Sequence, residues 1–202
     1  MQILNHEQGS QEWLDARCGV ITASNISKLV TSQGKVSTQR PNYLAQLVSE
    51  RITKELPQFH KSDAMERGNE LEAQARSTFE FITDLEVKEV GLCKMDEWRG
   101  CSPDGLIDFG TWGECGVEIK CPLGHTQIKY LKASKVPAEY VPQVQWSMFI
   151  TGMDIWHFYS YHPQIQDLHI VVKRDEKLIQ LMKTESDLLI EEAKTMIENW
   201  SK

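Results

Sequence analysis

The amino-acid sequence predicts an α/β protein with a mixed central β-sheet flanked by helices. Its segments alternate as helices, three strands, helices, two strands and a final helix, an order typical of a sheet covered on both faces. Two short apolar runs flank a Gly/Trp-rich turn within residues 100–122, which indicates a β-hairpin. The chain has 202 residues, of which 41% are hydrophobic, and it contains no internal repeat or interdomain linker. We therefore expect residues 1–202 to form a single domain.

The N-terminal half is expected to be mainly helical. Ser10 is a suitable N-cap for a first helix that Gly19 ends. Small hydroxyl residues up to Ser24 precede a second helix; such residues can seat a phosphate, although taken alone they are better explained by ordinary helix capping. Pro41 fits the first turn of a third helix. The second, third and fourth expected helices cover residues 25–30, 41–55 and 63–82, with a polar loop at 31–40 and a break at 57–61.

The C-terminal half supplies most of the expected strands. Pro142 fits the first turn of a helix, and the aromatic run that follows this helix is typical of a strand. Apart from the hairpin, the expected strands cover residues 85–95, 154–161 and 168–172, and the expected helices cover 125–133, 143–151 and 175–200. Trp13, Trp146 and Trp156 are interpreted as core residues rather than as platforms for stacked bases.

Composition limits the classes of function. A net charge of −7 disfavours a simple basic protein that coats DNA, although an enzyme that grips DNA locally remains compatible with it. No stretch of about 18 apolar residues is present, so we expect no membrane span, and the N-terminus lacks the pattern of a signal peptide. The five cysteines are odd in number and form no C-x-x-C pair, which argues against a disulfide framework or a zinc site and suits a reducing cytoplasm.

The hairpin carries the residues with the most chemical potential. Asp104 opens its first apolar run, and Glu118 and Lys120 lie two apart in the second, so their side chains share one face while Ile119 points to the other. A salt bridge on an exposed sheet face would explain this pair. A metal site is the alternative, since Asp104 and Glu118 supply the hard oxygens that Mg²⁺ prefers. The Ile119 carbonyl would add a third oxygen, and Lys120 would hold the attacking water.

Five segments occur together in an order typical of one nuclease family. They are EWLDARCGVITAS at 12–24, RGNELE at 67–72, CSPDGL at 101–106, EIKCP at 118–122 and YVPQVQWSM at 140–148. The chain resembles the lambda-type exonuclease family, also called the YqaJ-like viral recombinase nucleases, over about residues 11–175. The resemblance implies a PD-(D/E)xK (restriction-endonuclease-like) nuclease core. It also implies Mg²⁺-dependent degradation of one strand of linear duplex DNA from its 5′ end to mononucleotides, which leaves a 3′ overhang.

The same resemblance implies partners and a setting. Family members need Mg²⁺ and commonly assemble as a trimeric ring around DNA. We expect two ions, with Mn²⁺ as a substitute, because a pair of ions can supply the nucleophile, the charge neutralisation and the leaving-group stabilisation that hydrolysis needs. Family members work beside a single-strand annealing protein in phage recombination. We therefore expect a cytoplasmic, phage- or prophage-encoded protein that acts on double-stranded DNA ends and has no membrane partner.

Carried over by position, the resemblance assigns the hydrolytic site. Asp104 and Glu118 match the metal-binding carboxylates, and the Ile119 carbonyl matches the backbone ligand. Lys120 matches the lysine that positions or activates water. The remaining members are an acidic residue of the preceding helix and a polar pair that lines the site, matched by Glu72, Gln143 and Tyr140.

The choice of Glu72 over Glu70 depends on spacing. Glu72 falls four residues after Gly68, as in the family's lambda member. It also lies one residue from Leu71 and three from Ala75, so it borders the predicted buried face of its helix. Most of the other charged side chains of this helix are expected to face water.

The resemblance also implies a pocket for the terminal 5′-phosphate, formed by Arg17, Ser24 and Ser102. Arginine suits this task because its guanidinium donates paired hydrogen bonds to phosphate. One position departs from the family pattern: the lambda member has an arginine that wedges the duplex end apart, and Gly34 falls there, beside Lys35. Lys35 and Arg40 remain candidate DNA contacts.

The sequence thus favours a Mg²⁺-dependent 5′→3′ double-strand DNA exonuclease. An endonuclease on the same fold and a catalytically idle DNA-end-binding recombination scaffold are the alternatives. The intact set of Asp104, Glu118 and Lys120 argues against the scaffold, which has no need of it.

Overall fold

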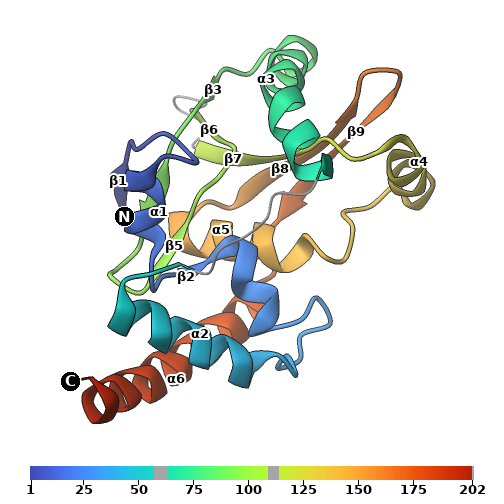
Figure 1. The fold of residues 1–202 in the computed structure, drawn as a ribbon. Coiled ribbons are helices and arrows are strands. Elements are labelled where there is room, and N and C mark those ends of the chain that lie inside the picture. Colours follow the sequence, from blue (N-terminus) through green and yellow to red (C-terminus); the bar gives the residue numbers. More distant parts are fainter. Residues whose placement is uncertain (57–62, 109–113, 202) are drawn as a thin grey trace.

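Two mixed β-sheets form the framework of the protein in a computed structural model that describes residues 1–56, 63–108 and 114–201 (Figure 1). The larger sheet has the strand order β3-β6-β7-β8-β9, with β7 and β8 parallel and the other pairs antiparallel. Its strands are β3 (Val87–Lys88), β6 (Gly105–Asp108), β7 (Glu114–Lys120), β8 (Ile155–His162) and β9 (Ile165–Lys173). The predicted hairpin is therefore present as β6 and β7; its expected turn, residues 109–113, lies outside the described residues.

The smaller sheet was not predicted as a separate sheet. Its order is β1-β4-β5-β2, in which β2 runs parallel to β5 and the other pairs are antiparallel. Its strands are β1 (Gln2–Leu4), β2 (Ile21–Thr22), β4 (Leu92–Lys94) and β5 (Arg99–Cys101).

The expected single strand at 85–95 is wrong: it divides into β3 and β4, which belong to different sheets. The N-terminal segment crosses the chain between them at Gly91. A Cβ atom at Gly91 would lie 2.2 Å from the carbonyl oxygen of His6 and 2.6 Å from that of Leu4, so only glycine allows this crossing.

The helices agree closely with the sequence prediction. They are α1 (Gln11–Arg17), α2 (Arg40–Thr53), α3 (Asp63–Thr83), α4 (Gly124–Ala133), α5 (Val141–Thr151) and α6 (Glu176–Trp200). Ser10 caps α1 by accepting a hydrogen bond from the Trp13 backbone N–H, and Pro41 and Pro142 lie in the first turns of α2 and α5. The second expected helix is instead a 3₁₀ helix, η1 (Ala23–Lys28). The predicted break at 57–61 lies outside the described residues and is not tested.

Helices cover both faces of the larger sheet, as predicted. On one face Ala75 and Phe79 of α3 pack against Val117, Ile119 and Tyr159. On the other face α5 packs against β8, and the members of this cluster are Val144, Met148, Met153 and Trp156. A third cluster joins η1, α2, α5 and α6 around the fully buried Trp146. In the described parts of the chain, no helix has the length and apolar character needed to cross a bilayer.

Candidate active site

Strand β7 places Glu118 and Lys120 on the face of the larger sheet that α5 covers. Ile119 points the opposite way, into the core under α3, as the two-residue repeat of a strand requires. The pairing of β6 with β7 begins at Gly105 opposite Val117, so the preceding Asp104 lies beside the end of β7. Asp104 accepts a hydrogen bond of 2.6 Å from the Ile119 backbone N–H, and its carboxylate lies 3.7 Å from the Lys120 Nζ atom.

Glu118 is the most buried member of this group, with 1% of its surface exposed. Its Oε1 atom accepts from the Lys120 ammonium and from the Gln143 side-chain amide. Its Oε2 atom is buried and has no hydrogen-bond partner among the described residues. Burial raises the pKa of Glu118 to about 7, against the opposing effect of Lys120 and with a further raising effect of Asp104. An orphaned carboxylate oxygen in such a place is costly unless another group binds it.

Lys120 is held in its charged form. Burial alone would lower the pKa of its ammonium, but the attraction of Glu118 and then Asp104 outweighs burial and raises the pKa above the usual value. The ring of Tyr140 lies under the ammonium, with 5.4 Å from Nζ to the ring centroid. Lys120 is therefore a proton donor and a positive charge at neutral pH, not a free base.

Helix α5 supplies two of the predicted residues from its first turn. Tyr140 occupies its N-cap position and Gln143 follows one turn on, so both side chains reach the end of β7. Tyr140 also packs against the buried Phe158, with 5.6 Å between ring centroids, and edge-on against Tyr130 of α4.

Glu72 reaches the edge of this group from α3. Arg67 ties α3 to the chain after β7, since its Nη1 atom donates to the carbonyls of Cys121 and Pro122 at 3.0 and 3.1 Å. The Glu72 carboxylate pairs with Arg76 at 2.9 Å. Burial raises the pKa of Glu72, and the negative charge of Asp104 raises it further. Glu70 is exposed, so the geometry favours Glu72 as the helix carboxylate.

The oxygen atoms at the end of β7 fit a divalent cation. Asp104 and Glu118 offer carboxylate oxygens, of which one is buried and unpartnered. The N–H and C=O groups of a strand residue point to the same edge, so the Ile119 carbonyl faces the side where its N–H meets Asp104. Hard oxygens of this kind suit Mg²⁺. In the described residues, however, no three Asp, Glu, His or Cys side chains already lie close enough to form a metal cluster, so Glu72 stands apart from the pair.

The three residues expected to bind a 5′-phosphate are close together. Arg17, at the end of α1, donates from Nη1 to the Ser102 hydroxyl at 3.0 Å and from Nη2 to the Ser24 hydroxyl at 3.2 Å. Burial lowers the pKa of Arg17 to about 10, so its guanidinium remains charged at neutral pH. Ser102 lies two residues before Asp104, which places this cluster beside the carboxylates.

Sequence reasoning missed Trp13 in this cluster, and it included Thr22 only among the small hydroxyl residues that can seat a phosphate. The indole N–H of Trp13 donates to the Ser102 hydroxyl at 3.1 Å, and its ring lies 4.0 Å from the Arg17 Cζ atom. The Thr22 hydroxyl lies 3.2 Å from that of Ser24. The four-residue spacing of Trp13 and Arg17 on a helix was the available signal, because such residues lie on one face. Trp146 and Trp156 are core residues, as predicted.

The two candidate DNA contacts differ in their surroundings. Lys35 is exposed in the loop between η1 and α2, directly after Gly34. Arg40 instead pairs with two glutamates of α6, at 2.6 Å from Glu192 and 3.4 Å from Glu185. This guanidinium therefore joins α2 to α6, and the role of Arg40 as a DNA contact stays a prediction, as does that of Lys35.

Comparison with known proteins identifies the family. Residues 12–154 match the YqaJ-like viral recombinase domain. The chain belongs to this family. The family assignment made from sequence is thereby confirmed, and the segment matched includes every residue predicted for the hydrolytic site and for the 5′-phosphate pocket.

Solved structures support the fold of the YqaJ-like domain. An alkaline exonuclease from Laribacter hongkongensis is 33% identical, with a TM-score of 0.83 over 94% of this chain and 95% of that chain. That enzyme has also been solved in complex with dAMP. A phage-related exonuclease from Haemophilus somnus 129PT has a TM-score of 0.69 at 16% identity, over 90% of this chain and 96% of that one, and shows the fold alone. The α/β fold class is thereby confirmed.

A shorter match concerns a curated protein of Escherichia coli (strain K12) named ExoD. It is 40% identical over 45 residues, which make up 21% of this chain. The match spans about half, 52%, of that protein's length.

Proposed function

We propose that this protein is a Mg²⁺-dependent exonuclease that degrades one strand of linear double-stranded DNA from its 5′ end. Mononucleotides would be the product, and a 3′ single-stranded overhang would remain for phage-type recombination. Membership of the YqaJ-like family and likeness to the Laribacter alkaline exonuclease support an exonuclease, and the dAMP complex of that enzyme supports a DNA substrate.

The observation that carries the proposal is the arrangement around Glu118. A buried carboxylate with one unpartnered oxygen, beside a second carboxylate and a charged lysine, is poorly explained as a structural salt bridge. It is well explained as a site that binds a cation. Perturbed carboxylates and lysines of this kind cluster where proteins perform acid–base or phosphoryl chemistry.

Asp104, Glu118 and the Ile119 carbonyl would hold the metal, and Glu72 could approach from α3. When bound, Mg²⁺ supplies positive charge to the scissile phosphate and activates the attacking water, with Mn²⁺ as a substitute. We propose two such ions, as in other two-metal phosphodiesterases.

The chain's own residues orient the reactants. Lys120 keeps its proton on Nζ and donates toward the attacking water or a phosphate oxygen, adding a fixed positive charge. Gln143 donates to Glu118 Oε1 and so fixes the carboxylate with its other oxygen free for a ligand. Tyr140 packs beneath Lys120 and limits the positions of the ammonium.

The Arg17 cluster would give the reaction its direction. Ser102 accepts from both Arg17 and Trp13, so its own proton is directed elsewhere, toward an incoming anion. A 5′-phosphate bound by Arg17, Ser24 and Ser102 would place the first phosphodiester bond near Asp104. Each cleavage would leave a new 5′-phosphate that could move into the same pocket.

The remaining expectations concern assembly. We propose a homotrimeric ring around DNA, a single-strand annealing protein as partner, and a cytoplasmic setting in a bacterial host, with a phage or prophage origin. Membership of the viral recombinase family supports the origin. Gel filtration with light scattering tests the trimer, since a monomeric mass at working concentration would contradict it.

A two-substrate assay tests the activity. The protein is incubated with Mg²⁺ and either linear or covalently closed circular duplex, with 5′- or 3′-labelled ends on the linear form. We expect loss of the linear form alone, with early release of the 5′ label as a mononucleotide. Nicking of the circle would indicate an endonuclease, and loss of neither form would indicate an end-binding scaffold. Glu118→Gln is the inactive control.

A further inference from the structure

The segment that follows Arg17 is held by the C-terminal part of α2. The backbone N–H of Gly19 donates to the Glu50 Oε2 atom at 2.9 Å, and the Cys18 thiol donates to the Glu50 backbone carbonyl at 3.4 Å. Glu50 is only 5% exposed, and Gln46 donates to its other oxygen at 2.7 Å. A buried carboxylate with both oxygens satisfied fixes the backbone two residues after Arg17.

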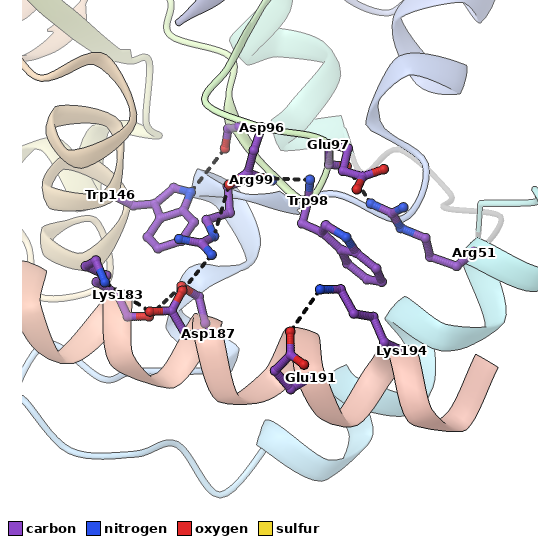
Figure 2. A network of polar contacts seen from close by, with 12 residues as sticks. Arg51, Asp96, Glu97, Trp98, Arg99, Trp146, Lys183, Asp187, Glu191 and Lys194 are labelled. Carbon is purple, nitrogen blue, oxygen red and sulfur yellow. Dashed lines mark hydrogen bonds and ion pairs between the residues drawn. The ribbon is translucent and has the colours of Figure 1, made fainter. Parts of the chain in front are cut away.

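Arg51, the next residue of α2, joins this segment to the strand that leads to Ser102. Its Nε atom donates to the Gly19 carbonyl at 2.8 Å, and its Nη2 atom donates to the Glu97 carbonyl. Its guanidinium lies 3.5 Å from the centroid of the Trp98 ring. Figure 2 shows Arg51 approaching Glu97 and Trp98 from α2.

Two chain segments carry the Arg17 cluster, and Arg51 contacts both of them. The first, the Arg17 arm, is the end of α1 with Arg17 and the residues that follow it. The second, the Ser102 arm, is β5, directly after which Ser102 follows. The arms also meet through the parallel pairing of β2 with β5, where Ile21 donates to the Trp98 carbonyl at 2.7 Å. Figure 2 shows the far side of β5 anchored to α6, where Arg99 pairs with Asp187 at 2.6 Å.

The packing around Gly19 leaves no room for a side chain. Its φ of +69° is a conformation that side-chain-bearing residues rarely adopt, and an added Cβ would lie 2.7 Å from the Arg51 Cγ atom. The Arg51 stem therefore fills the space that a side chain at position 19 would occupy. Movement of Arg51 would be transmitted directly to the backbone beside Arg17.

We propose that Glu50 and Arg51 are positioning residues for 5′-phosphate recognition, which set the separation of Arg17 from Ser102. This inference rests on the proposed function, because it assigns these residues to the pocket proposed there. Neither residue touches the phosphate. Glu50 fixes the Arg17 arm and lies close enough to favour the charge of its guanidinium, and Arg51 fixes that arm relative to the Ser102 arm. A pocket held from behind in this way is ready for its ligand without rearrangement.

The test compares rates on otherwise identical duplexes with 5′-phosphate or 5′-hydroxyl ends. Arg51→Ala removes both arms' contacts, and we expect the preference for phosphorylated ends to fall at least about tenfold, since errors near 1 Å in positioning can cost up to about 10²-fold. The rate on hydroxyl ends should stay near that of the parent. Arg51→Lys, a milder change, keeps the charge but cannot reproduce the fork of donors, so it should also lower the preference.

Two further variants sharpen the result. Glu50→Gln keeps the shape but offers one acceptor where two are needed, so we expect a smaller loss of preference. Arg174→Ala is the matched control, because Arg174 also donates to two backbone carbonyls, those of Met148 and Met153 at 2.7 and 3.2 Å, away from this cluster. It should lower the melting temperature without changing the preference.

Each outcome is decisive. Selective loss on phosphorylated ends in the Arg51 variants, with the Arg174 control unchanged, supports the inference. An equal fall on both substrates, or an unchanged preference, overturns it, because a merely structural role predicts those results. Arg17→Ala tests the 5′-phosphate pocket separately from the positioning role of Glu50 and Arg51. If Arg17→Ala leaves the preference for phosphorylated ends unchanged, the proposed pocket is wrong, and the positioning role is wrong with it.

Discussion

Glu118 and Lys120, two residues apart on one strand, form an ion pair in which Glu118 is buried and Lys120 is partly exposed, and the pair uses only one of the two Glu118 oxygens. The positive charge of Lys120 offsets part of the negative charge of Glu118, but burial still raises the pKa of Glu118 to about 7. Burial thus opposes the ionisation of Glu118, Lys120 favours it, and a bound cation would favour the ionised form further.

Replacement of Lys120 by alanine should abolish turnover while leaving DNA binding and folding nearly intact. Loss of the ammonium removes both the donor beside the attacking water and the main charge that stabilises ionised Glu118. We expect kcat to fall about 10²–10⁴-fold, the range typical of a proton-handling group. Single-turnover kinetics at saturating Mg²⁺ measures this.

The control for Lys120→Ala is Lys129→Ala, which removes an exposed lysine from α4. Equal melting temperatures and equal duplex affinity in the two variants would attribute the loss to chemistry. Digestion by Lys120→Ala at the parent rate would show that Lys120 has no part in the reaction.

Gln143→Ala should raise the Mg²⁺ concentration needed for half-maximal activity. Gln143 donates to Glu118 Oε1, and residues that orient a metal ligand typically contribute about 10–100-fold to metal affinity. The rate at saturating Mg²⁺ should change much less. A titration of activity against Mg²⁺ concentration gives both quantities.

Gln145→Ala is the matched control on the same helix. Gln145 is buried, donates to the Lys173 carbonyl at 2.9 Å and accepts from the Asp175 N–H at 2.7 Å, so its loss affects packing between α5, β9 and α6. It should lower stability and leave the Mg²⁺ titration unchanged. If both variants shift the titration equally, the effect of Gln143 is structural rather than directed at Glu118.

Local patterns were enough to predict that Asp104, Glu118 and Lys120 lie together, because all three belong to one hairpin. The two-residue repeat of β7 places Glu118 and Lys120 together and turns Ile119 away, and a hairpin brings Asp104 to the same end. What the patterns could not supply are contacts between distant segments. The Trp13 indole meets Ser102 across 89 residues of sequence, and nothing in α1 alone indicates that its tryptophan has this partner.

The buried Glu50 and the division of residues 85–95 have the same physical origin. Glu50 looks like a solvent-facing charge in the pattern of α2, but a backbone N–H from another segment satisfies it. Residues 85–95 are mostly alternating or β-prone, yet they divide between two sheets, and the N-terminal segment packs closely against Gly91 between the two strands. Tertiary contacts decide both cases, and local propensity cannot register them.

Arg17→Ala should erase any preference for 5′-phosphorylated over 5′-hydroxyl ends. The guanidinium donates to both serine hydroxyls and carries the positive charge of the cluster, so its removal takes away charge and alignment together. Competition between the two kinds of labelled duplex in one tube measures the preference directly. Arg17→Lys should restore only part of it, because an ammonium lacks the fork that matches phosphate. A persistent preference in Arg17→Ala would remove Arg17 from phosphate binding.

The last prediction concerns acid stability and a histidine pair under α3. His157 of β8 and His169 of β9 approach to 2.7 Å between Nδ1 and Nε2, with their rings stacked, and Phe79 of α3 lies edge-on to both. Burial lowers the pKa of His157 to about 4, and His169 lowers it further in the same direction. The pKa of His169 is itself lowered by burial.

Because the folded-state pKa of His157 lies below the value of about 6.5 for an unfolded histidine, the unfolded chain binds more protons between these limits. The stabilising effect of the neutral pair is therefore complete above about pH 6.5 and is lost as the pH falls toward 4. We expect the free energy of unfolding to drop by of the order of 2 kcal/mol across this window from His157 alone. Urea unfolding at a series of pH values measures the slope.

His157→Phe should flatten this acid limb, since phenylalanine keeps the contact with Phe79 but cannot take up a proton. Its stability at pH 7.5 should be lower than that of the parent, because His169 loses a hydrogen-bond partner. His125→Gln, which changes an exposed histidine of α4, is the control and should follow the parent curve. If His157→Phe loses stability between pH 6.5 and 4 as steeply as the parent, acid sensitivity arises from groups other than this pair.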